Sequence, residues 1–509
     1  MSSSEILPLE GVSRVPLDLE ERPNIRTCGI GDLPVEILGH IFSMIHSQTI
    51  SSSMTNFTTS DTVLRLSHVH PLWRETCISV SSLWSHIHII RASSDEVKRT
   101  EMFLERSGTS LLTIEFRARA NTIPYTPEAN RMIQKLFAAC ERWKGASFSV
   151  QAQSIEQIMI ALFGENKTPQ LEQKFYFPFL ETLSFTSRPE SQNRRFFDIF
   201  QQKSTPRLHN LVIPNYTTFL PFAFGQITDL TLSKMNKDFP DLSVLCPHLV
   251  RLKIGQTFGE SNEPTPAHAA TTFELPKLET MIVSCSGPGR LWSMLTLPSL
   301  RNLALEAITF MPLEHVAILN MLRRSGCGLG LRRLTLAYMD ITDVDVMSML
   351  SLMPQLEEFV LHETLLRQQK ILTPRLLMVL KLPNTHQDLA TTVNDSTFVS
   401  PAVTRAHFIP NLAYIELQVY YFPTFGLDLL FDMLSSRAVI SSGDHSSLYS
   451  TRQASGTLKQ IVLRFVLDEV NPPFQIPLEL ENMVNRLRLV STSHIQSIVQ
   501  CGQEWKKEF

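Results

Sequence analysis

The chain has 509 residues, of which 43 % are hydrophobic and 19 % charged. This excludes an intrinsically disordered protein and indicates at least two structural units. The formal net charge of −3 provides no overall field that would favour nucleic acid or an anionic membrane as a partner. Seven scattered cysteines, with no CxxC pair, indicate reduced thiols rather than a disulfide framework or a zinc ribbon.

Residues 1–29 are polar, contain three prolines and show no periodicity, which is typical of a flexible leader. The start of the chain lacks the basic and apolar regions of a signal peptide. No apolar run approaches the roughly 18 residues needed to cross a bilayer. We therefore expect a soluble intracellular protein, cytoplasmic and/or nuclear, with no membrane partner.

A dense apolar stretch from Leu33 to Ile45 predicts a helix. Pro34 is tolerated at its start, and Glu36 complements the positive end of the helix dipole. Helical spacing gives two apolar rows, one of Ile37, Ile41 and Ile45 and the other of Leu38 and Phe42. A helix this apolar needs cover on two sides, whereas a short module supplies only one. The uncovered side predicts a partner surface.

Three polar segments are expected to form exposed loops. The first, 46–61, is rich in serine and threonine and separates the apolar stretch from renewed apolar patterning between Val63 and Trp84. The other two are insertions at 384–405 and 436–456.

The segment Leu33–Phe42, which reads LPVEILGHIF, matches every specified position of L-P-x-E-I-L-x-x-I-F, the opening of an F-box. Leu66–Arg74 resembles the second stretch of that family, and Leu83-Trp84 resembles its closing pair. The resemblance covers about 31–90. It departs from the family in the long Ser/Thr loop and in a small slip around Ser67.

By resemblance, 31–90 is a three-helix F-box that binds a Skp-type adaptor and, through it, a cullin and a RING protein. The adaptor-binding residues carried over in this way are Leu33, Pro34, Ile37, Leu38, Ile41, Phe42, Val69 and Trp73. The alternative is that 31–90 only caps the first repeat of the following domain.

A motif of the form P-x-L-x-x-L-x-L recurs from about residue 178 onward. Its first leucines recur 19 to 31 residues apart as far as Leu356, close to the roughly 20–29 of leucine-rich repeats. Copies with proline begin at Pro178, Pro206, Pro247, Pro276, Pro298, Pro354 and Pro410, and looser copies include Ile227/Leu230/Leu232, Leu331/Leu334/Leu336 and Leu458/Ile461/Leu463.

The region 170–465 resembles leucine-rich-repeat proteins, in which the apolar face of each turn is buried by the next turn. Apolar residues at helical spacing in 314–324 and 343–353 predict helices between the strands. Earlier strands are expected at 112–116 and 146–150. The family's Asn or Cys after the strand is replaced, for example by Met339, which predicts an irregular solenoid.

The predicted fold class is α/β, with a small all-α F-box followed by an irregular solenoid of parallel strands over 91–509, closed by a C-terminal cap. Segments 180–185, 249–254, 300–305 and 356–361 should be neighbouring parallel strands on one curved sheet.

Candidate catalytic and metal motifs are weak. His86 and His88 share one face of a predicted strand without an evident third ligand, so they are interpreted as core or surface histidines. The glycines of 326–330 follow a helix and indicate a C-cap rather than a phosphate loop. Asp340, Asp343 and Asp345 indicate a turn and a helix cap rather than a calcium loop. We therefore expect no enzyme, no catalytic residue, no metal and no cofactor.

The combined layout is most similar to large fungal families of F-box proteins with degenerate leucine-rich repeats. The expected function is that of a substrate-recognition adaptor in an SCF-type (Skp–cullin–F-box) ubiquitin ligase, with an unknown protein substrate held by the repeats. The alternative is a non-catalytic leucine-rich-repeat scaffold or recruitment protein that acts outside a ligase.

Overall fold

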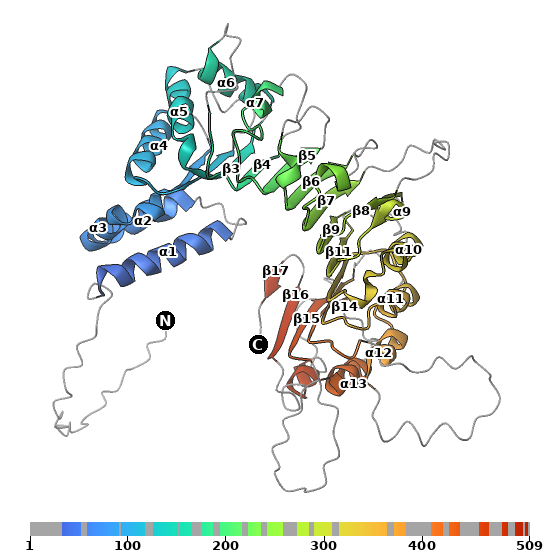
Figure 1. Ribbon diagram of the computed structural model, residues 1–509. Helices are drawn as coiled ribbons and strands as arrows, with labels where there is room; N and C mark the ends of the chain where they lie inside the picture. The colour runs from blue at the N-terminus through green and yellow to red at the C-terminus, as the bar shows by residue number, and fades with distance from the viewer. Residues whose placement is uncertain are drawn as a thin grey trace, which may run out of the picture.

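A computed structural model places the chain as an N-terminal group of helices followed by a long arc of strands (Figure 1). The structure describes residues 33–51, 59–90, 93–117, 126–150, 152–164, 175–186, 194–215, 222–235, 242–257, 272–284, 290–307, 315–363, 371–382, 409–420, 427–437, 458–467, 481–486, 494–501 and 504–506. The predicted leader 1–29 and the insertion 384–405 lie outside these ranges, as does 438–456 of the third predicted loop.

One 15-stranded sheet runs through the arc, with its strands in chain order apart from β8 and β10, which form a separate pair. Neighbours are parallel up to β16, and β17 closes the sheet antiparallel. The strands of this sheet are β1 (His86–Ile89), β2 (Leu112–Arg117), β3 (Trp143–Ser149), β4 (Thr182–Phe185), β5 (Asn210–Asn215), β6 (Asp229–Met235), β7 (Arg251–Thr257), β9 (Thr280–Ser284), β11 (Asn302–Glu306), β12 (Arg333–Ala337), β13 (Glu358–His362), β14 (Tyr414–Tyr420), β15 (Gln460–Leu467), β16 (His494–Cys501) and β17 (Glu504–Lys506).

The prediction of parallel strands in one sheet is confirmed, because β4, β7, β11 and β13 all belong to this ladder. They are not direct neighbours, because strands from the intervening copies of the repeat lie between them. In register across the sheet, a row of apolar side chains, each at most 3 % exposed, forms the core. The row consists of Ile87, Ile114, Ala146, Leu183, Leu211, Leu230, Leu252, Met281, Leu303, Leu334, Phe359, Ile415 and Ile461. Because each side chain is covered by those of the adjacent strands, the sequence repeat and the structural repeat are the same.

The proline of the repeated motif has a local cause. In six of the proline copies, the first leucine N–H donates to the carbonyl three residues earlier, which closes a tight turn with proline at its second position. These turns join Phe177 to Leu180, Thr205 to Leu208, Cys246 to Leu249, Leu275 to Leu278, Leu297 to Leu300 and Met353 to Leu356. The turn ends each return segment and starts the next strand.

Helices cover the outer side of the arc, so the sheet lines its inner side (Figure 1). The predicted helices at 314–324 and 343–353 are observed as α10 (His315–Ser325) and α11 (Asp343–Leu350). The remaining outer helices are α4 (Ser94–Arg106), α5 (Pro127–Ala138), α6 (Ala152–Phe163), α7 (Arg194–Asp198), α8 (Leu242–Leu245), α9 (Arg290–Met294), α12 (Pro374–Leu380) and α13 (Leu427–Arg437), with the pair β8 (Phe273–Glu274) and β10 (Leu295–Thr296) beside them.

Two boundaries differ from the prediction. The segment 46–61 is not wholly a loop, because α1 (Val35–Ser51) continues to Ser51 and α2 (Thr59–Val69) begins at Thr59. The apolar row that includes Ile41 and Ile45 propagates the first helix into the polar segment. The sheet also starts before residue 91, because β1 pairs with β2 although it lies within 31–90.

The predicted caps are observed at α10 and α11. Gly326 follows α10 in the left-handed region at φ 63°, where glycine carries no steric penalty. Thr342 and Asp345 form a capping box at the start of α11.

Gly328→Ala is expected to destabilise the repeats around α10 by about 1–3 kcal/mol, because a Cβ there would lie 2.2 Å from the Leu352 carbonyl oxygen. The adjacent backbone must move to relieve this contact. Hydrogen exchange of α10 and α11 measures the effect. The matched control is Gly225→Ala, because a Cβ added at Gly225 would meet no atom within 4 Å. Equal protection in the two variants would show that the backbone beside Gly328 yields without cost.

Candidate partner-binding surfaces

The N-terminal helices expose one apolar row and bury the other. Ile37 and Ile45 are 48 % and 37 % exposed, whereas Leu38 and Phe42 are 0 % and 1 % exposed. The Phe42 ring lies 5.0 Å from that of Trp73 on α3 (Pro71–Ser79). The folded chain therefore covers only one of the two apolar sides of this helix.

Further exposed apolar side chains lie on the same helix, and together with the exposed row we call them the α1 patch. It consists of Val35, Ile37, Met44 and Ile45, all more than a third exposed. Val69 on α2 and Ile78 on α3 are further exposed apolar side chains of the same group of helices, at 62 % and 44 %. Isolated apolar side chains on a surface are ordinary, but four on one helix suggest a contact surface.

The eight predicted adaptor-binding residues divide into three groups. Pro34, Ile37 and Val69 are exposed, and Leu33, Ile41 and Trp73 are half-buried. Leu38 and Phe42 offer no surface for direct contact, because they are covered by the chain's own helices. Their place in the fold is to hold α1 on its neighbours. Met44 was not among the predicted residues, although it continues the exposed row at the i+7 position after Ile37.

Trp84 anchors these helices to the solenoid. It is fully buried at the end of the 3₁₀ turn η2 (Ser81–Trp84), and its indole N–H donates to the Cys77 carbonyl at 2.6 Å. Phe103 of α4 packs edge-on at 5.0 Å, and the Arg106 guanidinium lies 4.4 Å from the ring centroid. One side chain thus joins α3 to the first outer helix, directly before the first strand begins.

His86 and His88 are core histidines, at 8 % and 7 % exposure. Their Nε2 atoms lie 3.7 and 3.9 Å from Glu115 Oε2, which is longer than a hydrogen bond. Within the part of the chain that the structure describes, no group of three or more His, Cys, Asp or Glu side chains is arranged to hold a metal.

The inner face of the sheet carries a polar network near the C-terminal end of the arc. Glu416 Oε1 accepts from His362 at 3.0 Å and from Arg464 at 2.5 Å, and its Oε2 accepts from the Tyr414 hydroxyl at 2.5 Å. Burial opposes ionisation of Glu416, but these three donors outweigh it and lower its pKa to about 2. Beside His362 stands Tyr338, exposed and held at φ 58°, a conformation unusual for a residue with a Cβ. An ionised, preorganised group of this kind suits recognition of a polar partner.

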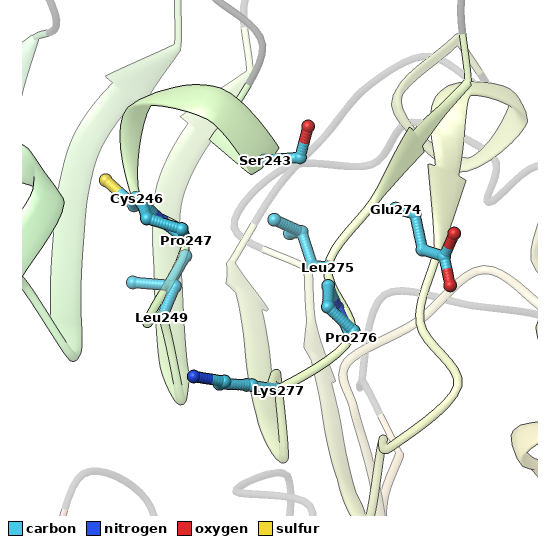
Figure 2. A pocket seen from close by; sticks show the side chains of 8 residues that line it. All are labelled: Ser243, Cys246, Pro247, Leu249, Glu274, Leu275, Pro276 and Lys277. Carbon is cyan, nitrogen blue, oxygen red and sulfur yellow. The ribbon is translucent and has the colours of Figure 1, made fainter.

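A cavity of about 310 Å³ lies between two turns of the solenoid (Figure 2). Its lining comprises Ser243, Cys246, Pro247, Leu249, Glu274, Leu275, Pro276 and Lys277. Burial raises the pKa of the Cys246 thiol to about 12, so this sulfur stays protonated and unreactive at neutral pH. In Figure 2 its sulfur and the Glu274 carboxylate point away from each other. The lining therefore does not form a nucleophile–base pair.

The strand ladder and the repeated turn define a leucine-rich-repeat-like solenoid with a parallel sheet on its inner side. No protein-family model matches the sequence, and no curated protein matches it. Among solved structures, the chain is similar to an internalin from Listeria monocytogenes, at 12 % identity and a TM-score of 0.27, covering 62 % of this chain and 76 % of that one. None of the described helices is long and apolar enough to span a bilayer.

Proposed function

We propose that this chain is a non-catalytic recruitment adaptor of an SCF-type ubiquitin ligase. In this proposal the N-terminal helices bind a Skp-type adaptor and, through it, a cullin and a RING protein, while the inner face of the repeats holds a protein substrate in the cytoplasm and/or the nucleus. No cofactor, metal or nucleic acid takes part.

The observation that carries this proposal is the α1 patch. Among the described helices, the one whose sequence resembles the F-box opening is the one with four large apolar side chains exposed. Complete burial of each such side chain contributes on the order of 1.5–3 kcal/mol. Association entropy offsets much of that sum, so the central residues of the patch should dominate the affinity.

The repeats support the second half of the proposal. A sheet that lines the inside of an arc offers a long surface on which side chains from successive strands act together. A substrate bound there would share one molecule with the adaptor-bound helices, so the ligase would meet it at high effective concentration. The polar network around Glu416 is the most strongly organised part of this face.

The double variant Ile37→Asp/Ile45→Asp is expected to weaken binding of a purified Skp-type adaptor by at least about 30-fold, or about 2 kcal/mol. Both side chains are exposed, so the fold should persist. Calorimetric titration of the full chain, with a thermal melt of the same samples, measures both quantities. The matched control is Val316→Asp/Val344→Asp, which changes two exposed apolar residues on α10 and α11.

Parent-like affinity in the Ile37/Ile45 variant would mean that α1 does not contact the adaptor. If the parent chain fails to bind any Skp-type adaptor, the alternative that 31–90 only caps the first repeat would be favoured. Co-purification of the adaptor without a cullin would instead favour a scaffold that acts outside a ligase.

A further inference from the structure

Three histidines from distant parts of the sequence meet where α1 touches the sheet. His46 lies on α1, and His86 and His88 lie on β1, at 6 %, 8 % and 7 % exposure respectively. The rings of His46 and His86 are 6.3 Å apart between centroids and nearly perpendicular, at 80°. The proposed adaptor helix, which packs on α2 and α3 through Leu38 and Phe42, thus also meets the first strand through a pair of imidazoles.

These rings are short of hydrogen-bond partners. Both ring nitrogens of His46, both of His88 and Nε2 of His86 are buried without one. Buried polar atoms are nearly always paired, so a cluster with five unpaired nitrogens weakens the contact it forms. The cost is smallest when the rings are neutral, because an unpaired buried charge costs far more than an unpaired buried dipole.

The charged groups around the cluster do not favour a proton on His46. Glu115 on β2 faces His86 and His88, and it is engaged by Arg117, whose Nε donates to it at 2.6 Å. Arg99 on α4 donates to the His88 carbonyl at 3.1 Å and pairs with Glu96. Among the side chains of α2 and α3 that the structure describes, the titratable ones are Arg65, His68, Arg74 and Glu75, which are exposed, and Cys77, which is buried.

Of the three histidines, His46 is therefore the one whose positive charge would be least compensated by neighbouring acidic groups. Its burial, followed by the neighbouring His86, lowers its pKa to about 4 from 6.5. Burial is also the main cause that lowers the pKa of His88, although Glu115 opposes it. Glu115 in turn has its pKa lowered to about 2, chiefly by His86.

We propose that the His46–His86 contact is a proton-sensitive latch, which holds α1 against the sheet while His46 is neutral and releases it when His46 takes up a proton on acidification. Release would change the presentation of the α1 patch and so regulate adaptor binding, a consequence that rests on the proposed function. The latch itself concerns only α1 and β1.

The direction and size of the pH effect on α1 opening follow from the linkage between opening and proton binding. When α1 detaches, His46 enters water and regains an ordinary affinity for protons, so the open form binds more protons than the closed form and gains population as the pH falls. With pKa values of 6.5 open and about 4 closed, the ratio of open to closed α1 should rise about 3-fold from pH 7 to pH 6 and about 20-fold from pH 7 to pH 5. Below pH 4 the effect of His46 levels off.

Hydrogen exchange of the full chain in the presence of a chelator tests this, with rates converted to protection factors to remove the intrinsic pH dependence. Protection of α1 should fall about 20-fold between pH 7 and pH 5, while that of β11, β12 and β13 stays constant. His46→Met should abolish the pH dependence of α1. His40→Gln, which changes an exposed histidine on the same helix, should preserve it. His46→Gln provides a second non-titrating variant if the methionine variant does not fold.

Constant protection of α1 in the parent, a retained pH dependence in the folded His46 variant, or loss of protection throughout the sheet would each overturn the latch. Adaptor binding is measured separately at both pH values. Opening that depends on pH, without any adaptor binding, would support the latch and overturn the proposed function. Adaptor binding together with constant α1 protection would support the proposed function and overturn the latch.

Discussion

Trp84→Ala is expected to destabilise the junction between the N-terminal helices and the sheet by about 4 kcal/mol. Truncating a fully buried tryptophan leaves a large cavity, which alone costs about 3–5 kcal/mol. It also leaves the Cys77 carbonyl without its indole donor and removes the ring beneath Arg106. Because the Trp84 side chain joins α3 to α4 and its turn leads into β1, these three elements should lose stability.

Hydrogen exchange resolved by element is the appropriate measurement, because a solenoid does not unfold in one step. Protection should fall in α2, α3, β1 and α4 but not in β11, β12 and β13. Trp84→Phe keeps most of the volume and loses the hydrogen bond to Cys77, so its effect should be about 1–2 kcal/mol. If Trp84→Ala and Trp84→Phe reduce protection equally, the packing volume of Trp84 is not what stabilises this junction.

Arg437→Ala is expected to destabilise the C-terminal repeats by about 3–5 kcal/mol. Arg437 is completely buried at the end of α13, and its guanidinium donates to the Leu380 and Ile409 carbonyls. Ile409 stands at φ 45°, a strained conformation for a β-branched residue. Arg437 thus ties α12 to the strained turn that leads into β14.

The exposed Arg375 on α12 supplies the matched control, and Arg375→Ala should change stability by no more than about 0.5 kcal/mol. In Arg437→Ala, hydrogen exchange should accelerate in α12, α13, β14 and β15. The strands β4 to β7 should retain their protection, because each repeat depends mainly on its neighbours. Acceleration along the whole sheet would show that the repeats unfold as one cooperative unit instead.

The two ends of the molecule are thereby predicted to respond independently. Figure 1 shows α1 at one end of the arc and β15, β16 and β17 at the other. Damage at Trp84 should reach the proposed adaptor contact, whereas damage at Arg437 should reach the polar network around Glu416. Separate assays of adaptor binding and substrate binding could therefore assign a defect to one surface.

The sequence by itself determined the repeat. The P-x-L-x-x-L-x-L pattern encodes a local turn and a strand with alternating faces, and both depend on residues within one repeat. For this reason the pattern alone assigns Leu183, Leu252 and Leu303 to the core, where all three are buried. The end of α1 could not be placed in this way, because helical continuation overrode the polar composition of 46–51.

Only the tertiary structure decided which apolar row of α1 is buried. Both rows are apolar in sequence, but in the fold Phe42 packs against Trp73 and Leu38 is buried with it, while Ile37 and Ile45 stay exposed. The meeting of His46 with His86 likewise joins residues 40 positions apart, and no local pattern encodes it. Local periodicity fixes what a segment can bury, whereas the shape of the neighbouring elements fixes which face they cover and which groups they bring together.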